Sequence, residues 1–172
     1  SMLAQVCAHK AETDRMLTII GQLDTILCVG EYRTFLKDYT VPEYRGKSYR
    51  AKELYHPLLQ EPVKNDVDVK KSMLITGSNA SGKSTFLKTV AINAVLAQSI
   101  HTVCADSYSA DNFRIYSSLT LKDNIFDGDS YYMAEIKSIK RIMDAYAAEG
   151  APVLAFVDEV LRGTNTIERI SA

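Results

Sequence analysis

Gly77-Ser-Asn-Ala-Ser-Gly82-Lys83-Ser84-Thr85 is the stretch that decides the fold. It matches the P-loop pattern GxxxxGK[ST] in full, and it stands between a short apolar run, 72–76, and a stretch with helical periodicity, 84–99. In such a loop the glycines let backbone N–H groups turn towards phosphate oxygens, at the positive end of a helix dipole. The stretch therefore predicts a site for a nucleotide, with ATP as the ligand.

Each position of this loop has an expected role. Lys83 is placed to reach the β- and γ-phosphates, which makes it a candidate catalytic residue, and the Ser84 hydroxyl is placed to ligate Mg²⁺. The other positions are expected to bind the phosphates: Gly77, Ser78, Asn79, Ala80, Ser81, Gly82 and Thr85.

A second motif is an apolar strand, Val153-Leu-Ala-Phe-Val157, that ends in Asp158-Glu159. In open parallel sheets ligands bind at the carboxyl ends of the strands, so these carboxylates should face the P-loop. Asp158 would hold Mg²⁺ through a water, and Glu159 would polarise the attacking water as a general base. A carboxylate pair after a strand is by itself more often a solvated strand end, but a complete P-loop in the same chain favours a Walker B motif.

The order of the apolar patterns predicts an α/β fold. We expect a P-loop NTPase with a central, largely parallel sheet flanked by helices and preceded by a helical segment. The expected domains are a helical segment, 1–45, and a P-loop ATPase domain, 46–172. The expected helices are 3–29 (stopped by Gly30), 84–99 and 130–148, with 31–39 as a second short helix or a continuation. The expected strands are 72–76, 102–108, 113–119 and 152–157, with 48–54 and Leu58-Leu59 as edge strands.

Composition limits the partners of this chain. Apolar residues make up 47% of its 172 residues, enough for a core, and a net charge of −1 is an ordinary cytosolic balance. A domain that grips a DNA backbone by itself usually carries an excess of Lys and Arg, so any DNA contact is expected from other domains. The three cysteines have no metal-ligand spacing and predict free thiols. The sequence contains no run of 18 apolar residues, so we expect no segment of this chain to span a membrane.

The run Asp158-Glu-Val-Leu-Arg162-Gly163-Thr164-Asn-Thr166 resembles the DE-x-x-RGT-x-T segment of the MutS family of DNA mismatch-repair ATPases, a branch of the ABC-type ATPases. The resemblance extends collinearly over nearly the whole chain from Leu23 onwards. The other matching stretches are Leu23-Asp24, His56-Pro57, Asn65-Asp66, the P-loop preceded by Ile75-Thr76, Asp123-Asn124-Ile125, and Gly128-Asp-Ser130-Tyr-Tyr-Met133-Ala-Glu135.

The resemblance implies further site residues. Ser130 would be the signature serine that reaches the γ-phosphate bound by the opposite subunit, so the enzyme would be a homodimer with composite ATP sites. From the residues alone, Ser130 is a plain helix N-cap. Val63, Lys64 and Asn65 fall where the family packs the adenine; an aromatic side chain is usual there, and Val63 offers an aliphatic surface instead.

Departures from the family pattern suggest a divergent branch, and they bear on the substrate more than on the nucleotide chemistry. The resemblance also implies that residues 1–45 are a helical lever or connector, and that the ATPase domain, 46–172, is truncated after the Walker B motif, since the family continues there through further strands. We therefore expect the fragment to bind nucleotide but to hydrolyse it weakly, and to associate through an unsatisfied sheet edge. The departures are Ser78 for Pro, Ala80-Ser81 for Met-Gly, Leu161 for Gly and Tyr131-Tyr132 for Thr-Phe.

Three functional hypotheses follow. The first is an ATP-driven enzyme of the mismatch-repair type, in which ATP closes a dimer and moves a distant DNA clamp. The second is a MutS-like motor with a different partner, in a protein with other or membrane-borne N-terminal regions. The third is a nucleotide-sensing dimerisation module with negligible hydrolysis. The motifs imply ATP and Mg²⁺ as ligands, and the composition and cysteines predict a cytoplasmic location without membrane contact from this chain.

Overall fold

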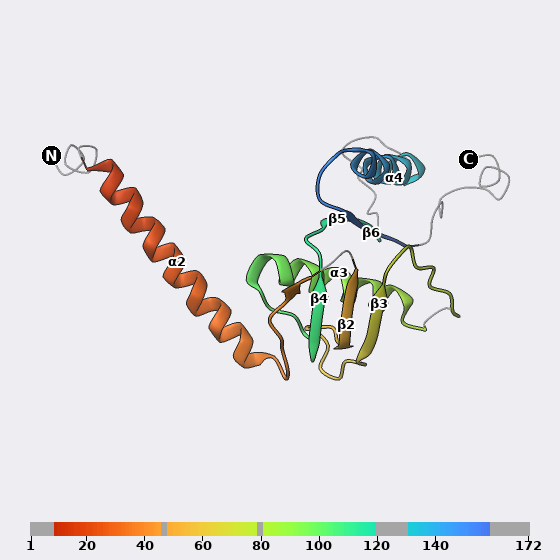
Figure 1. The fold of residues 1–172 in the computed structure, drawn as a ribbon, viewed down its shortest axis with the longest axis horizontal. Coiled ribbons are helices and arrows are strands. Elements are labelled where there is room, and N and C mark those ends of the chain that lie inside the picture. Colours follow the sequence, from red (N-terminus) through yellow and green to blue (C-terminus); the bar gives the residue numbers. More distant parts are fainter. Residues whose placement is uncertain (1–8, 46–47, 79–80, 120–130, 159–172) are drawn as a thin grey trace. The chain divides into compact units, whose positions relative to one another are not determined.

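The computed structural model describes residues 9–45, 48–78, 81–119 and 131–158 (Figure 1). Contact clustering divides the chain into two compact units, Ser1–Tyr39 and Thr40–Ala172. The predicted elements outside the described residues include the beginning of the first helix and everything after Asp158. Among the described residues, no helix is both long enough and apolar enough to cross a membrane.

The first unit consists of one helix, α2 (Lys10–Phe35). The prediction of a stop at Gly30 was wrong, because the helix runs through this residue without a break and ends at Leu36, which is extended. An interior glycine costs a helix only about 1 kcal/mol relative to alanine, too little to end it when the flanking residues favour helix. None of the described residues of α2 is buried.

The second unit contains a four-stranded mixed sheet formed by β1 (Glu43–Tyr44), β2 (Tyr49–Leu54), β3 (Asn65–Val69) and β4 (Ser107–Ala110), in the order β1-β4-β2-β3. β1 and β4 run parallel, whereas β2 is antiparallel to both of its neighbours. The prediction that 48–54 forms an edge strand was therefore wrong. Leu58 and Leu59 also form no strand and are 80% and 46% exposed.

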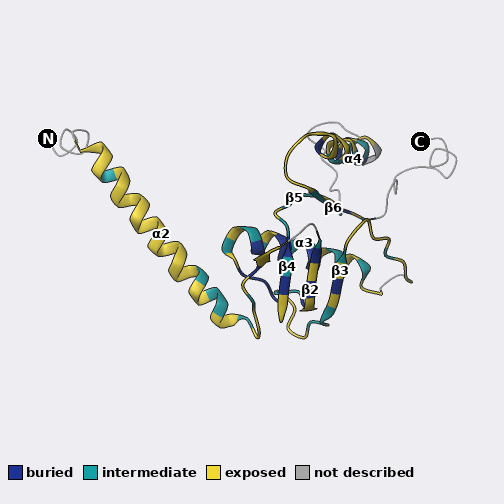
Figure 2. Ribbon diagram, in the orientation of Figure 1, coloured by how far each residue is buried: buried dark blue, intermediate teal, exposed yellow. Residues whose placement is uncertain are grey.

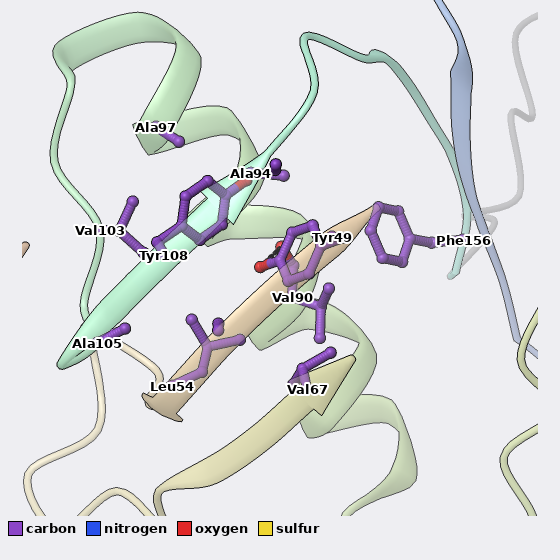
Figure 3. Close-up of a cluster of buried hydrophobic side chains, with 12 residues drawn as sticks. Tyr49, Leu54, Val67, Val90, Ala94, Ala97, Val103, Ala105, Tyr108 and Phe156 are labelled. Atoms are coloured by element: carbon purple, nitrogen blue, oxygen red, sulfur yellow. Dashed lines mark hydrogen bonds between the residues drawn. The ribbon is translucent and has the colours of Figure 1, made fainter. Parts of the chain in front are cut away.

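Helix α3 (Lys83–Ile100) supplies the other half of the core (Figure 3). Its predicted inward face is confirmed, since Val90, Ala94 and Ala97 are buried against strands β2 and β4, with Phe86 and Leu87 partly buried beside them. Small side chains on this face let the helix approach the sheet closely. Of the predicted strand 102–108, only Ser107 and Tyr108 belong to β4, which continues to Ala110.

Asn93 is the polar centre of this core. Its side chain is fully buried, donates to the Tyr55 carbonyl and the Thr89 carbonyl at 3.0 Å each, and accepts from the Cys104 backbone N–H at 2.8 Å. A buried amide is stable only when its donors and acceptor are satisfied, and these three bonds satisfy it. Asn93 therefore joins α3 to the segments after β2 and before β4.

The remaining elements form a smaller layer. β5 (Arg114–Ser118) and β6 (Val153–Val157) pair in parallel, as the predicted strands 113–119 and 152–157 require, and α4 (Tyr131–Ala147) matches the predicted helix 130–148. The Arg114 side chain donates to the carbonyls of Ala145, Ala148 and Ala151 at 2.9, 3.1 and 2.9 Å. This guanidinium ties the end of α4 to the start of β5.

The predicted apolar face of α4 was wrong in part. Met133 and Met143 are 43% and 65% exposed, whereas Glu135, Ser138 and Ala145 are buried. Ile136, Ile139 and Ile142 are partly buried, which agrees with the predicted apolar face. The face of α4 that is buried therefore contains Glu135, Ser138 and Ala145, and the helix makes its element contacts with β5 and β6.

The segment 72–76 before the P-loop was predicted to be a strand, but it belongs to no ladder in the described part of the chain. Leu74 is 89% exposed there. The α/β class is thus confirmed, while the described strands form one mixed sheet and one parallel pair.

Candidate nucleotide site

The P-loop leads directly into α3. Gly82 is the residue before the helix and has a φ of 86°, a left-handed conformation that a glycine adopts without strain. The Phe86 N–H donates to the Gly82 carbonyl at 2.8 Å and closes the first helical turn. A Cβ atom added at Gly77 would lie 2.9 Å from the Ser81 hydroxyl oxygen, a contact that rotation of the Ser81 side chain would relieve. The backbone conformation therefore favours glycine at Gly82 in particular.

The Lys83 side chain folds back over the beginning of the loop. Its ammonium donates to the Gly77 carbonyl at 2.7 Å and to the Ser78 carbonyl at 2.6 Å. These bonds hold a positive charge beside the loop backbone and the N-terminus of an 18-residue helix. Both features attract phosphate.

Ser84 and Asp158 meet at the other side of the loop. The Ser84 hydroxyl donates to Asp158 Oδ2 at 2.5 Å, although the two residues are 74 positions apart in the sequence. Asp158 follows β6 directly, and its backbone N–H donates to the Ser118 carbonyl at 3.0 Å. The parallel pairing of β5 with β6 therefore fixes the position of the Asp158 carboxylate beside the first turn of α3.

The donor set fits Mg²⁺ with a nucleotide. A hydroxyl and a carboxylate are the hard oxygen ligands that Mg²⁺ prefers, and this ion usually keeps several waters and takes its other ligands from substrate phosphates. Within the described ranges no cluster of three His, Cys, Asp or Glu side chains could hold a metal by itself. Ser84 and Asp158 thus fit an ion that arrives with phosphate better than they fit a resident metal.

Several predicted site residues lie outside the described residues: Asn79, Ala80, Ser130 and Glu159. Their roles stay predictions. Of the remaining loop residues, Ser81 donates from its backbone to the Ser78 carbonyl at 3.3 Å, and the Thr85 carbonyl accepts from the Thr89 hydroxyl at 2.8 Å. These bonds order the turn and the first part of α3.

The residues predicted to contact adenine lie on the segment that leads into β3. Val63 is 78% exposed, and the Asn65 side chain donates to its carbonyl at 3.1 Å. The Lys64 ammonium lies 5.9 Å from the centre of the Tyr55 ring and 3.7 Å from Asp106 Oδ1. Tyr55 is the aromatic residue of this region, but it is itself buried and offers no open face for stacking.

The sequence analysis did not predict one contact that positions Asp158, the bond from its backbone N–H to the Ser118 carbonyl. A backbone acceptor leaves no mark on residue type, so only the pairing of β5 with β6 could have indicated it. The free cysteines were predicted correctly as far as the described residues show, since Cys28 and Cys104 are both free thiols.

Comparison with known proteins shows the family of this chain. Residues 73–172 match the family model described as MutS domain V. The DNA mismatch repair protein MutS of Methanothrix thermoacetophila is 30% identical over 179 aligned residues, covering 97% of this chain and 20% of that protein. MutS protein homolog 4 of Homo sapiens is 31% identical, with 98% and 18% covered. The DNA mismatch repair protein MutS of Thermosipho melanesiensis is 31% identical over 144 residues, with 79% and 17% covered. The chain thus spans at most a fifth of the length of these three relatives.

Proposed function

The chain belongs to the MutS family, and from that premise we propose that its P-loop binds ATP with Mg²⁺ and that the protein containing it hydrolyses the ATP. The hydrogen bond between Ser84 and Asp158 carries this proposal. It joins the two predicted metal ligands across 74 positions of the sequence, beside a lysine and a helix N-terminus that suit phosphate.

Each side chain has a defined task in the proposed site. The Lys83 ammonium exchanges its bonds to the Gly77 and Ser78 carbonyls for bonds to the β- and γ-phosphates. Ser84 and Asp158 hold the magnesium ion, which, when bound, offsets the negative charge that develops on the phosphates. Glu159 accepts the proton of the attacking water, and Ser130 contacts the γ-phosphate bound by a second subunit.

The proposed function extends beyond the described residues in three respects. Residues 1–45 act as a helical lever or connector to the ATPase domain 46–172. In that domain β5 and β6 belong to a larger, largely parallel sheet. ATP binding closes a homodimer with composite sites and is coupled to DNA through other regions of a cytoplasmic protein. Two of the relatives named above are DNA mismatch repair proteins, which favours mismatch repair over a different partner.

Nucleotide binding tests the first part of the proposal. Titration of the 172-residue chain with a fluorescent ATP analogue and Mg²⁺ should show saturable binding that Lys83→Ala weakens at least about tenfold, because a charged hydrogen-bond partner of phosphate is lost. Lys88→Ala is the matched control, since Lys88 is an exposed lysine further along α3. Equal affinities for the two variants would contradict the proposed phosphate site.

Asp158→Asn tests the metal ligands separately. This substitution keeps the size of the side chain but removes the charge that attracts Mg²⁺, so the dependence of nucleotide affinity on Mg²⁺ concentration should shift to higher concentrations. Titration with Mg²⁺ at fixed nucleotide concentration measures the shift. An unchanged magnesium dependence would remove Asp158 from the site.

Hydrolysis is best tested with Glu159→Gln, in a protein that carries this chain together with the regions its relatives have. We expect ATP turnover to fall by about 10²–10⁴-fold while ATP binding is retained, because a general base is removed. Unchanged turnover would show that Glu159 is not the base. Negligible turnover in the unsubstituted protein, with ATP still bound, would favour the nucleotide-sensing module instead.

A further inference from the structure

Helix α3 is hydrogen-bonded to the layer of β5 and β6 near both of its ends. In its first turn, the Ser84 hydroxyl donates to the carboxylate of Asp158, the residue after β6. In its last turn, the Gln98 side chain meets the backbone of Phe113, the residue before β5. One helix is thus joined to the same layer at two places that lie far apart.

The Gln98 amide makes two bonds with a single residue. Its Nε2 atom donates to the Phe113 carbonyl at 3.0 Å, and its Oε1 atom accepts from the Phe113 N–H at 2.6 Å. Both bonds are partly buried, whereas the bond between Ser84 and Asp158 is exposed to solvent. Because water competes less for a shielded pair, the bonds of Gln98 form the more lasting of the two connections.

The two connections are compatible in length. An α-helix rises by about 21 Å between Ser84 and Gln98. A strand that runs from Phe113 to one residue beyond Ser118 covers about 20 Å. The register of β5 with β6 places Asp158 at this point, one residue beyond Ser118. The bonds at one end of α3 therefore determine which residue after β6 comes level with the other end.

Apolar packing between α3 and β6 does not set this position by itself. Phe156 of β6 lies in the core cluster that contains Val90 of α3 (Figure 3). Contacts of this kind are non-directional, so they bring the two elements together without selecting one position along the helix. Hydrogen bonds do select a position, because they weaken steeply when the donor and the acceptor are misaligned.

From this arrangement we propose that Gln98 is a positioning residue of the magnesium site. It fixes the start of β5 against the last turn of α3, and thereby holds the Asp158 carboxylate beside Ser84 at the far end of the same helix. Metal ligands must be held within about 0.5 Å of their working geometry, which one exposed hydrogen bond secures poorly. This inference rests on the proposed function, because it assigns a role within the same site.

Gln98→Met tests the positioning role, since it keeps the length of the side chain and removes both bonds. The probe is the fluorescent ATP analogue, titrated with Mg²⁺ at a fixed analogue concentration and measured separately without Mg²⁺. The Mg²⁺ concentration at half-maximal binding should rise about threefold to tenfold, because the two metal ligands lose their common alignment. The affinity for the analogue without Mg²⁺ should be unchanged, because Gln98 lies at the opposite end of α3 from the P-loop.

Three further variants separate positioning from general stability. Val67→Ala reduces packing in the same core from β3, which pairs with β2, so it should lower the urea unfolding midpoint without moving the Mg²⁺ dependence. Ser99→Ala removes an exposed hydroxyl next to Gln98 and should change neither quantity. Gln98→Glu keeps an acceptor for the Phe113 N–H, so its shift should be smaller than that of Gln98→Met. Circular dichroism checks that each variant is folded.

Asp158→Asn provides the reference for the site itself. If Asp158→Asn raises the Mg²⁺ requirement and Gln98→Met does not, the proposed site stands and the role of Gln98 is overturned. A shift for Val67→Ala as large as that for Gln98→Met would overturn it as well, since general loosening would explain both. An unchanged Mg²⁺ dependence for Asp158→Asn would contradict the proposed site, and the role of Gln98 with it. Should Gln98→Met fail to fold, Gln98→Glu takes its place in the same comparison.

Discussion

Helices α2 and α3 are both amphipathic in sequence, yet they differ in what covers their apolar residues. α3 buries Val90, Ala94 and Ala97 against strands of the same unit, whereas none of the described residues of α2 is buried. The side chains differ accordingly: α3 presents small residues that fit a closely packed sheet. The Leu, Ile and Met residues of α2 are exposed, as is most of that helix (Figure 2). An apolar stripe thus predicts a helix in both cases, but not whether its partner belongs to the same folding unit.

The largest effect is expected in the centre of the α3 interface. Asn93→Ala should lower the free energy of unfolding by about 3 kcal/mol, because the buried Cys104 N–H and Tyr55 carbonyl each lose a partner. Urea unfolding followed by tyrosine fluorescence would measure this loss, since Tyr49 and Tyr108 lie in the same core. Ser99→Ala, on the exposed side of α3, is the control. A loss for Asn93→Ala no larger than for this control would show that the buried network contributes little.

A smaller effect is expected where α3 begins. Gly82→Ala should cost about 1 kcal/mol, since the backbone there has a φ of 86° that an L-residue adopts only with strain. No atom lies within 4 Å of an added Cβ atom at this position, so the cost is conformational rather than steric. The same unfolding experiment measures it, and a stabilised variant would show that the loop takes another conformation.

The smallest effect on unfolding is expected in α2. Leu27→Ala should change the free energy of unfolding of the chain by less than about 0.5 kcal/mol, because this side chain is 71% exposed. The same urea experiment measures it, and a loss as large as that of Asn93→Ala would show that Leu27 is packed in the folded chain.

The elements that the sequence predicted well are those whose pattern is local. α3, α4, β5 and β6 each contain enough periodic residues to be recognised without their neighbours. The position of β2 depended on β3 and β4, and a strand's own residues do not say whether both of its edges are paired. β3 was not predicted at all, since its short run Asn-Asp-Val-Asp-Val is too polar to resemble a buried strand.

The candidate site followed the same rule. The P-loop and Walker B motifs predicted that Ser84 and Asp158 would approach each other, and the two side chains are hydrogen-bonded.

The buried face of α4 could not be predicted from its apolar residues, because Glu135 and Ser138 are buried while Met133 and Met143 are exposed. Buried polar residues depend on partners from other elements, which a helical pattern does not contain.

The bonds from Arg114 to the end of α4 have a mechanical consequence. One guanidinium holds the Ala145 carbonyl in the last turn of α4 and the carbonyls of Ala148 and Ala151 in the connection that follows, so this end of the helix is fixed, like a pivot, to the first residue of β5. A helix of 17 residues is about 26 Å long, so a tilt of about 5° around this pivot moves its other end by about 2 Å. Small angular changes between α4 and β5 would thus be magnified into displacements comparable to the length of a hydrogen bond.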